Sequence, residues 1–243
     1  MLSLRMAKYE EIARNEANKY HEYPGIVGIL WVGSTTFGVE DNLADIDLRI
    51  LVKNDHKSRP MQQYKIADIK IEVDEMQMNW LLDNLTLDSE QAWIIEKSIV
   101  LYDPEGKTTL TLKEVKTKLM KLDNKKLLWD NYSQLYLHYD LEKSLKRNQV
   151  ITAHIILSDI LDALSKFIFL YQKKAIPPKK WRWYMIRKDK LFEMENVDKL
   201  IKLNLSDSIE KVDQLIREIQ KECQKIMLDL RFEKDKVMEP WRF

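Results

Sequence analysis

The chain has 243 residues, 45% of them hydrophobic, which is enough for one large domain or two small ones with a substantial core. Its 40 Lys and Arg residues nearly balance its 39 Asp and Glu residues, so the net charge is +1. This balance argues against sequence-independent binding of long nucleic acid, which needs an excess of basic surface. The single cysteine, Cys223, excludes an intramolecular disulfide and is typical of a reducing compartment, so we expect a cytoplasmic location.

The first hundred residues mix helical and strand patterns. An amphipathic helix is expected over residues 4–20 and ends before Pro24-Gly25. In the third expected strand, apolar and charged residues alternate from Ile69 to Asp74, which predicts one buried and one polar face. Strands are expected at residues 26–32, 45–53, 64–76 and 99–102, and further helices at 80–85 and 89–97.

Beyond residue 108 no convincing strand pattern follows. Helical periodicity is found at residues 112–120, 127–146, 149–171, 197–203 and 207–232. The most apolar run, residues 151–171, is interrupted by His154, Asp159, Asp162 and Lys166, so it predicts a buried helix and no membrane association. We therefore predict an α+β protein, in which residues 1–108 form a mixed sheet with flanking helices and residues 109–243 form a helical bundle.

Two carboxylates stand one residue apart where the second strand begins. Side chains at positions i and i+2 of a strand point to the same face, so Asp45 and Asp47 should lie side by side. Two carboxylates held that close repel each other unless protons or cations intervene. A Mg²⁺ ion takes oxygen ligands and keeps positions open for phosphate oxygens, so it is the natural occupant.

A Gly33-Ser34 turn connects the first strand to the loop before this acidic pair. Glycine allows a close approach of the backbone, so the turn could present N–H groups and the Ser34 hydroxyl to phosphate oxygens. The turn and the carboxylates would then contact the same phosphorylated ligand.

Residues 26–75 resemble the signature of the DNA polymerase β-like nucleotidyltransferase superfamily. The matching features are a hydrophobic strand, Gly33-Ser34, a second glycine at Gly38, and Asp45-Ile46-Asp47-Leu48. An α/β half followed by a helical half is similar to the stand-alone bacterial and archaeal adenylyltransferases that modify antibiotics such as aminoglycosides. The resemblance implies a third carboxylate on a later strand. Glu72 fits best, and Asp74 stays as the alternative because both share one face of the strand.

The resemblance also implies a function. It predicts transfer of a nucleotidyl group, AMP from ATP or NMP from another NTP, to a hydroxyl of an acceptor, with a small molecule as our first expectation. Asp45 and Asp47 would hold Mg²⁺ or Mn²⁺ on the triphosphate, and Gly33 and Ser34 would contact the phosphates. Glu72 would serve as general base for the acceptor or as a further metal ligand.

Two departures from the family pattern keep a second hypothesis open. Ala44 stands where many relatives carry Ser, and residues 35–37 stand where many carry Arg. These departures favour an alternative in which the chain is a catalytically weak or inactive protein that binds a nucleotide or a partner on the same scaffold.

A basic aromatic segment follows Pro177-Pro178. Lys179 and Lys180 could bind phosphate or the acceptor, and an equally weighted alternative is a solvated surface beside aromatic packing. The neighbouring Trp181 and Trp183 could stack on a ligand ring, although large aromatic side chains in a helical half more often pack in the core.

Overall fold

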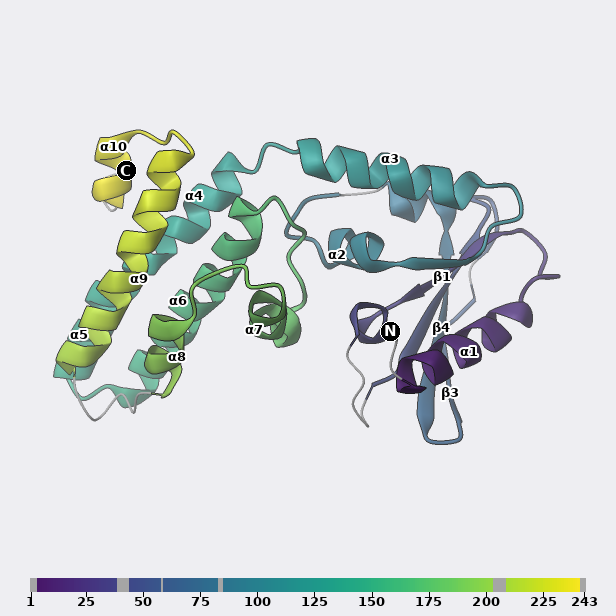
Figure 1. Cartoon of the computed structure of the whole chain (residues 1–243), viewed down its shortest axis with the longest axis horizontal. Helices are drawn as coiled ribbons and strands as arrows, with labels where there is room; N and C mark the ends of the chain where they lie inside the picture. The colour runs from purple at the N-terminus through teal and green to yellow at the C-terminus, as the bar shows by residue number, and fades with distance from the viewer. Residues whose placement is uncertain (1–3, 39–43, 58, 83–84, 203–208, 241–243) are drawn as a thin grey trace. The chain divides into compact units, whose positions relative to one another are not determined.

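The computed structural model of the chain describes residues 4–38, 44–57, 59–82, 85–202 and 209–240 (Figure 1). The chain divides into two compact units, Met1–Leu122 and Asp123–Phe243. The boundary predicted after residue 108 falls one helix earlier than this division. Helix α3 (Lys107–Lys121) packs on strand β1 (Ile26–Val32), so its contacts place it in the first unit.

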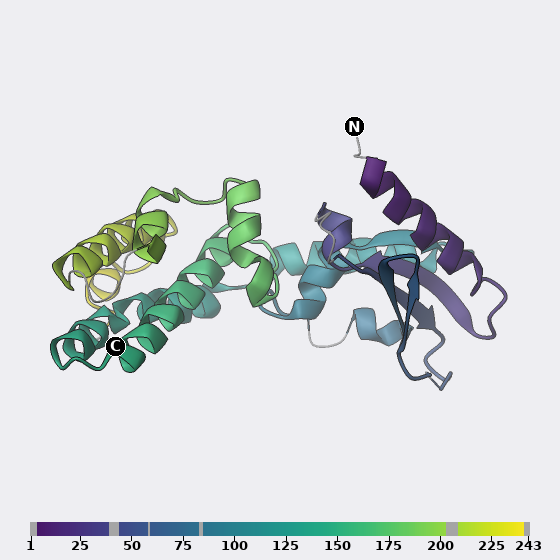
Figure 2. The same cartoon turned by 90° about the horizontal axis from the view of Figure 1, so that it is seen from below.

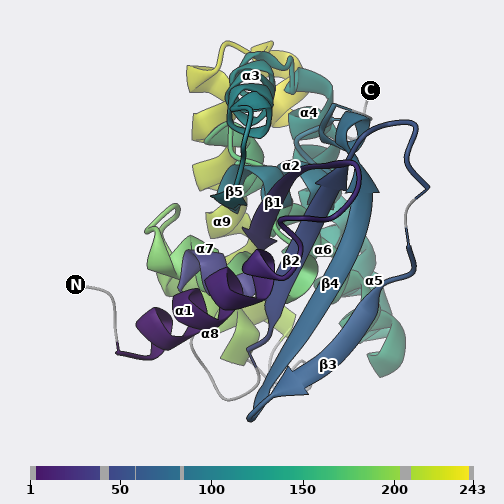
Figure 3. The same ribbon diagram turned by 90° about the vertical axis from the view of Figure 1, so that its right-hand side faces the viewer.

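A five-stranded mixed sheet forms the first unit, in the order β3-β4-β2-β1-β5. Strand β2 (Ile46–Val52) runs antiparallel to β1 and parallel to β4 (Ile69–Gln77). The edge strands β3 (Gln62–Ile66) and β5 (Ile99–Tyr102) are both antiparallel to their neighbours, and Figure 3 shows the strands side by side. The parallel pair at the centre matters for the site, because it determines which residues of β4 lie beside β2.

Helices cover both faces of this sheet. Helix α1 (Leu4–Asn18) buries Tyr9 and Ala13 against the face that carries Ile46 and Leu48. Helices α2 (Glu90–Lys97) and α3 pack on β1, and α3 lies on the opposite side of the sheet from α1 (Figure 1). Close contact on the α3 side requires Gly28, because a Cβ at this position would lie 2.2 Å from the Thr108 hydroxyl oxygen.

The strand expected over residues 64–76 is wrong as a single element. It is a hairpin, in which Ile66 of β3 pairs with Ile69 of β4 across the turn at Ala67 and Asp68. Ala67 has a φ of 52°, a left-handed conformation that usually selects Gly or Asn. Because Ala carries no turn signal, the sequence pattern ran through the turn without a break.

The second unit is helical. Its helices are α4 (Lys125–Gln134), α5 (His138–Lys146), α6 (Val150–Tyr171), α7 (Lys179–Lys188), α8 (Glu195–Lys202), α9 (Ile209–Asp229) and α10 (Lys234–Met238). Helix α6 packs against α4, α5 and α7 and buries Leu164, Phe167 and Ile168, while α9 packs against α5, α8 and α10 (Figure 2).

The predicted fold class, α+β with a helical second half, is confirmed, and no strand occurs in the described part of the second unit. The helix expected over residues 127–146 is interrupted by a 3₁₀ turn, η3 (Leu135–Leu137). Parts of three expected helices lie outside the described residues. They are residues 83–84 of the helix at 80–85, residue 203 at the end of the helix at 197–203, and residues 207–208 at the start of the helix at 207–232. No helix among the described residues is both long and apolar enough to cross a membrane.

We expect Ala67→Gly to stabilise the protein, because Gly adopts the left-handed conformation of this turn without the steric cost that Ala carries. The expected gain is about 1 kcal/mol in the free energy of unfolding, measured by urea unfolding followed by circular dichroism. The matched control is Ala7→Gly on the exposed side of α1, which should lower stability because Gly is a poor helix former. A loss of stability in Ala67→Gly would contradict the strained turn.

Candidate metal centre

Strand β2 positions the two aspartates. Its apolar residues alternate with polar ones, and Ile46 and Leu48 are fully buried on the α1 face. This alternation turns Asp45, just before the strand, and Asp47 toward the opposite face, where both are half-buried. The predicted pair therefore lies on one face of the sheet, held there by the burial of its apolar neighbours.

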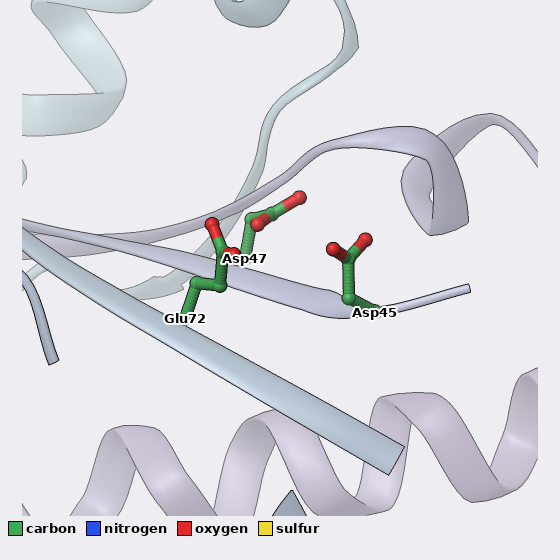
Figure 4. A group of neighbouring side chains, drawn as sticks. All are labelled: Asp45, Asp47 and Glu72. Carbon is green, nitrogen blue, oxygen red and sulfur yellow. The ribbon is translucent and has the colours of Figure 1, made fainter. Parts of the chain in front are cut away.

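Strand β4 brings a third carboxylate to the pair. In the parallel register Asp47 lies opposite Glu72, and Arg49 lies opposite Asp74. Oxygen atoms of Asp45, Asp47 and Glu72 all lie within 4.8 Å of one another, and Figure 4 shows the three carboxyl groups on the same side of the two strands. Asp74, the alternative third carboxylate, is instead 3.8 Å from the Arg49 guanidinium.

The Gly33-Ser34 turn lies directly against Asp47. Gly33 has a φ of 86°, and a Cβ at this position would be only 2.0 Å from Asp47 Oδ2. Only glycine permits both this backbone conformation and this close approach. Ser34 is buried and begins a short 3₁₀ turn, η1 (Ser34–Phe37). The turn predicted to meet phosphate is thus next to the carboxylate cluster.

Thr35 is a positioning residue that the sequence did not identify. It is fully buried, and its hydroxyl oxygen accepts a hydrogen bond from Trp31 Nε1 at 3.0 Å. The same hydroxyl donates to the Asp45 carbonyl oxygen at 3.3 Å. It therefore links strand β1 to the backbone of the first aspartate. No local sequence signal distinguishes such a threonine from any other turn residue.

Two donors orient Glu72. Its Oε1 atom accepts hydrogen bonds from Gln63 Nε2 of β3, at 3.1 Å, and from the Lys70 ammonium of β4. The hydrogen bond to Glu72 raises the pKa of Lys70, so the lysine stays charged beside the carboxylates. Alternation along β4 placed Lys70 on the same face as Glu72, whereas the contribution of Gln63 depends on the hairpin.

The ionised form of the Asp47 carboxyl group is disfavoured at this position. Burial, together with repulsion from Asp45 and Glu72, raises its pKa from 3.8 to about 7, and the nearby Arg49 opposes this shift. Among the described residues, these three carboxylates are the only group of His, Cys, Asp or Glu side chains close enough to share a metal ion. An all-oxygen, anionic donor set fits a hard divalent cation such as Mg²⁺ or Mn²⁺.

The two lysines predicted to bind phosphate or the acceptor lie on α7 in the second unit. The Lys179 ammonium is 3.5 Å from an Asp162 carboxylate oxygen. Lys180 is exposed, with its ammonium 5.5 Å from the centre of the Trp181 ring. These contacts are internal to the helical unit, and phosphate binding by the two lysines stays a prediction.

Comparison with known proteins gives distant structural likeness but no sequence match. No family model matches the chain, and no curated protein matches it. Among solved structures, the chain is similar to a nucleotidyltransferase-like protein from Exiguobacterium sibiricum. The two are 13% identical, with 91% of this chain and 79% of that chain covered and a TM-score of 0.45.

We expect Asp47 to make the metal-free protein less stable as the pH rises. Its pKa is higher in the folded state than its ordinary 3.8, so the folded state holds this proton more tightly than the unfolded state. The stabilisation is complete below 3.8 and is lost as the pH rises through about 7.

In buffer containing a chelator, Asp47→Asn should therefore be more stable than the wild type at about pH 8, by a margin that shrinks toward about pH 4. Urea unfolding across this pH range measures the margin. Asp55→Asn, at an exposed position away from the cluster, is the control and should show no such trend. A margin for Asp47→Asn that does not change with pH would contradict the raised pKa.

We expect Gly33→Ala to weaken metal binding, because the added Cβ must displace the Asp47 carboxylate. The affinity for Mn²⁺, measured by titration in an electron paramagnetic resonance experiment, should fall about 10- to 100-fold. Gly106→Ala is the matched control: Gly106 also has a positive φ, of 69°, but no described atom lies within 4 Å of the Cβ that would be added. Equal Mn²⁺ affinity in the two variants would show that contact with Asp47 is irrelevant.

Proposed function

We propose that the chain is a nucleotidyltransferase dependent on Mg²⁺ or Mn²⁺, which transfers AMP from ATP, or NMP from another NTP, to a hydroxyl of a small-molecule acceptor. The observation that carries the proposal is the convergence of Asp45, Asp47 and Glu72 beside the Gly33-Ser34 turn. A carboxylate cluster and a Gly-Ser turn in one place suit a ligand that arrives as a metal–triphosphate complex.

In this proposal the strands supply fixed positions for the metal ligands. Asp45 and Asp47, at the start of β2, would hold the ion, and the backbone of Asp45 is linked to β1 through Thr35. A bound divalent ion neutralises charge on the triphosphate during transfer. Ser34, next to the glycine that touches Asp47, would offer its backbone N–H and hydroxyl to the phosphate oxygens.

The transfer forms a bond between the acceptor oxygen and the α-phosphorus and releases pyrophosphate, so the acceptor hydroxyl must lose its proton. Glu72 is the candidate to accept this proton or to complete the metal's ligand set. Its close approach to both aspartates favours the role of ligand, and its hydrogen bonds from Gln63 and Lys70 would keep it oriented in either role.

The resemblance of residues 26–75 to the polymerase β-like superfamily supports this reaction class. By the same resemblance, the first unit would be the catalytic part and the second unit would bind the acceptor. Lys179 and Lys180, which the resemblance does not cover, are proposed as contacts to phosphate or to the acceptor.

The second candidate is a protein that binds a nucleotide or a partner with little or no turnover. The observation that favours it is the use of Thr35 as an internal link, where many relatives place an arginine. Such a protein would bind an NTP together with Mg²⁺ but would transfer no label from it.

The test combines calorimetry with a transfer assay. We expect at least one of the four NTPs to bind in the presence of Mg²⁺, and label from α-labelled ATP to enter an acceptor when a panel of small hydroxylated molecules is supplied. Binding without transfer to any acceptor would favour the second candidate. A lack of binding with all four NTPs and Mg²⁺ would refute the nucleotidyltransferase and the nucleotide-binding form of the second candidate.

Glu72→Gln and Asp74→Asn form a matched pair for the third carboxylate. We expect Glu72→Gln to lower transfer about 100-fold, because it removes a charge from the cluster. Asp74→Asn should change it by less than about fivefold, since Asp74 contacts Arg49 and its loss removes only a partly exposed ion pair. Metal-dependent ATP binding should follow the same order. The reverse order would assign the role to Asp74.

A further inference from the structure

A cavity of about 350 Å³ lies between α6 and α7 in the second unit. Its volume falls in the range of small-molecule sites, which is about 300–1,000 Å³. Its wall mixes apolar, hydroxyl and charged side chains, and the lining residues are His154, Leu157, Ser158, Leu161, Asp162, Ser165, Lys179 and Trp183.

Three cations converge on one carboxylate at this cavity. Asp162 is 2.7 Å from Arg182, 2.8 Å from Lys166 and 3.5 Å from Lys179. Burial alone would raise the pKa of Asp162, but the hydrogen bond from Lys166 and the three positive charges lower it, so the carboxylate stays ionised. Arg182 and Lys166 do not line the cavity, but together they neutralise Asp162, so the positive charge of Lys179 at the cavity is not cancelled by this carboxylate alone.

The three cations differ in how tightly they are held. Arg182 is only 12% exposed and also donates from Nε to the Pro177 carbonyl oxygen at 2.9 Å. Lys179 is 68% exposed and makes the longest of the three contacts. An anionic ligand could therefore bind Lys179 in place of Asp162 with little loss of stability, because a long, exposed ion pair contributes little to the stability of the fold.

The cavity also has an apolar wall, which is formed by Trp183, Leu157 and Leu161. Trp183 is half-buried, so part of its indole ring is still available to a ligand. Aromatic rings pack on indole in offset or edge-to-face arrangements that gain energy beyond the area they bury. A flat ring is therefore the ligand group that would pack best against this wall.

We propose that the α6–α7 cavity binds a flat aromatic or heteroaromatic molecule that carries one anionic group, with its ring against Trp183 and its anion on Lys179. The Lys179 ammonium in the lining disfavours a polycationic molecule in the same place. The proposal rests on the helical unit alone, and it holds whether or not Lys179 also contacts phosphate or the acceptor during transfer.

The test uses two fluorescent probes with the same kind of ring system, anilinonaphthalene sulfonate, which is anionic, and phenylnaphthylamine, which is neutral. Titrations of the full chain without NTP or metal should show one saturable sulfonate site per chain. Lys179→Gln should weaken binding of the sulfonate about fivefold and leave the neutral probe unchanged. Trp183→Leu, which keeps an apolar side chain but removes the planar ring, should weaken both probes.

Lys180→Gln is the matched control, because Lys180 adjoins Lys179 in the sequence and is exposed but does not line the cavity. It should leave both probes unchanged. Circular dichroism of each variant establishes that the helices persist, and Lys179→Gln keeps the proposal testable if Trp183→Leu does not fold. Equal effects of the two lysine variants, no effect of Lys179→Gln, or no saturable binding would each overturn the proposal. Because neither NTP nor metal is present, these outcomes do not bear on the transfer reaction.

Discussion

The repulsion among Asp45, Asp47 and Glu72 is the constraint on which the first unit's site depends. Three carboxylates within 4.8 Å of one another are costly, and burial of Asp47 increases the cost. The parallel pairing of β2 and β4 nevertheless imposes this arrangement, because it sets Glu72 opposite Asp47. Lys70 and Arg49 offset part of the charge, and a divalent cation would offset the remainder. A cation bound at the cluster would therefore offset a repulsion that the fold itself imposes.

The surrounding structure is adapted to that cluster. Gly33 makes room for the Asp47 carboxylate, and Thr35 connects the backbone of Asp45 to Trp31 of β1. Neither residue is a metal ligand in our proposal. Their contacts explain why a Gly-Ser turn precedes the acidic pair: the turn is required by packing against a carboxylate, whatever its further role toward phosphate.

Local pattern predicted what depends on local geometry. Period-two alternation was sufficient to place Asp45 and Asp47 side by side on β2. It could not separate Glu72 from Asp74, because alternation gives the face of a strand and not its register with a distant neighbour. The β3–β4 turn was missed because Ala67 takes a glycine-like conformation. The extent of the first unit depends on the packing of helix α3 against β1 and α2, which are contacts between separate elements that no local pattern reports.

The two candidate sites would select anions by different physical means. The carboxylate cluster repels a triphosphate and can accept one only through a cation that it binds first. The α6–α7 cavity presents the exposed Lys179 ammonium, whose partner Asp162 is also neutralised by Arg182 and Lys166, so an anion could bind there directly. Such direct charge contacts on an exposed lysine are weakened by salt, whereas an ion held among three partly buried carboxylates would be screened much less. Ionic strength and chelation therefore act on different sites of the same chain, which makes the two functions separable without any substitution.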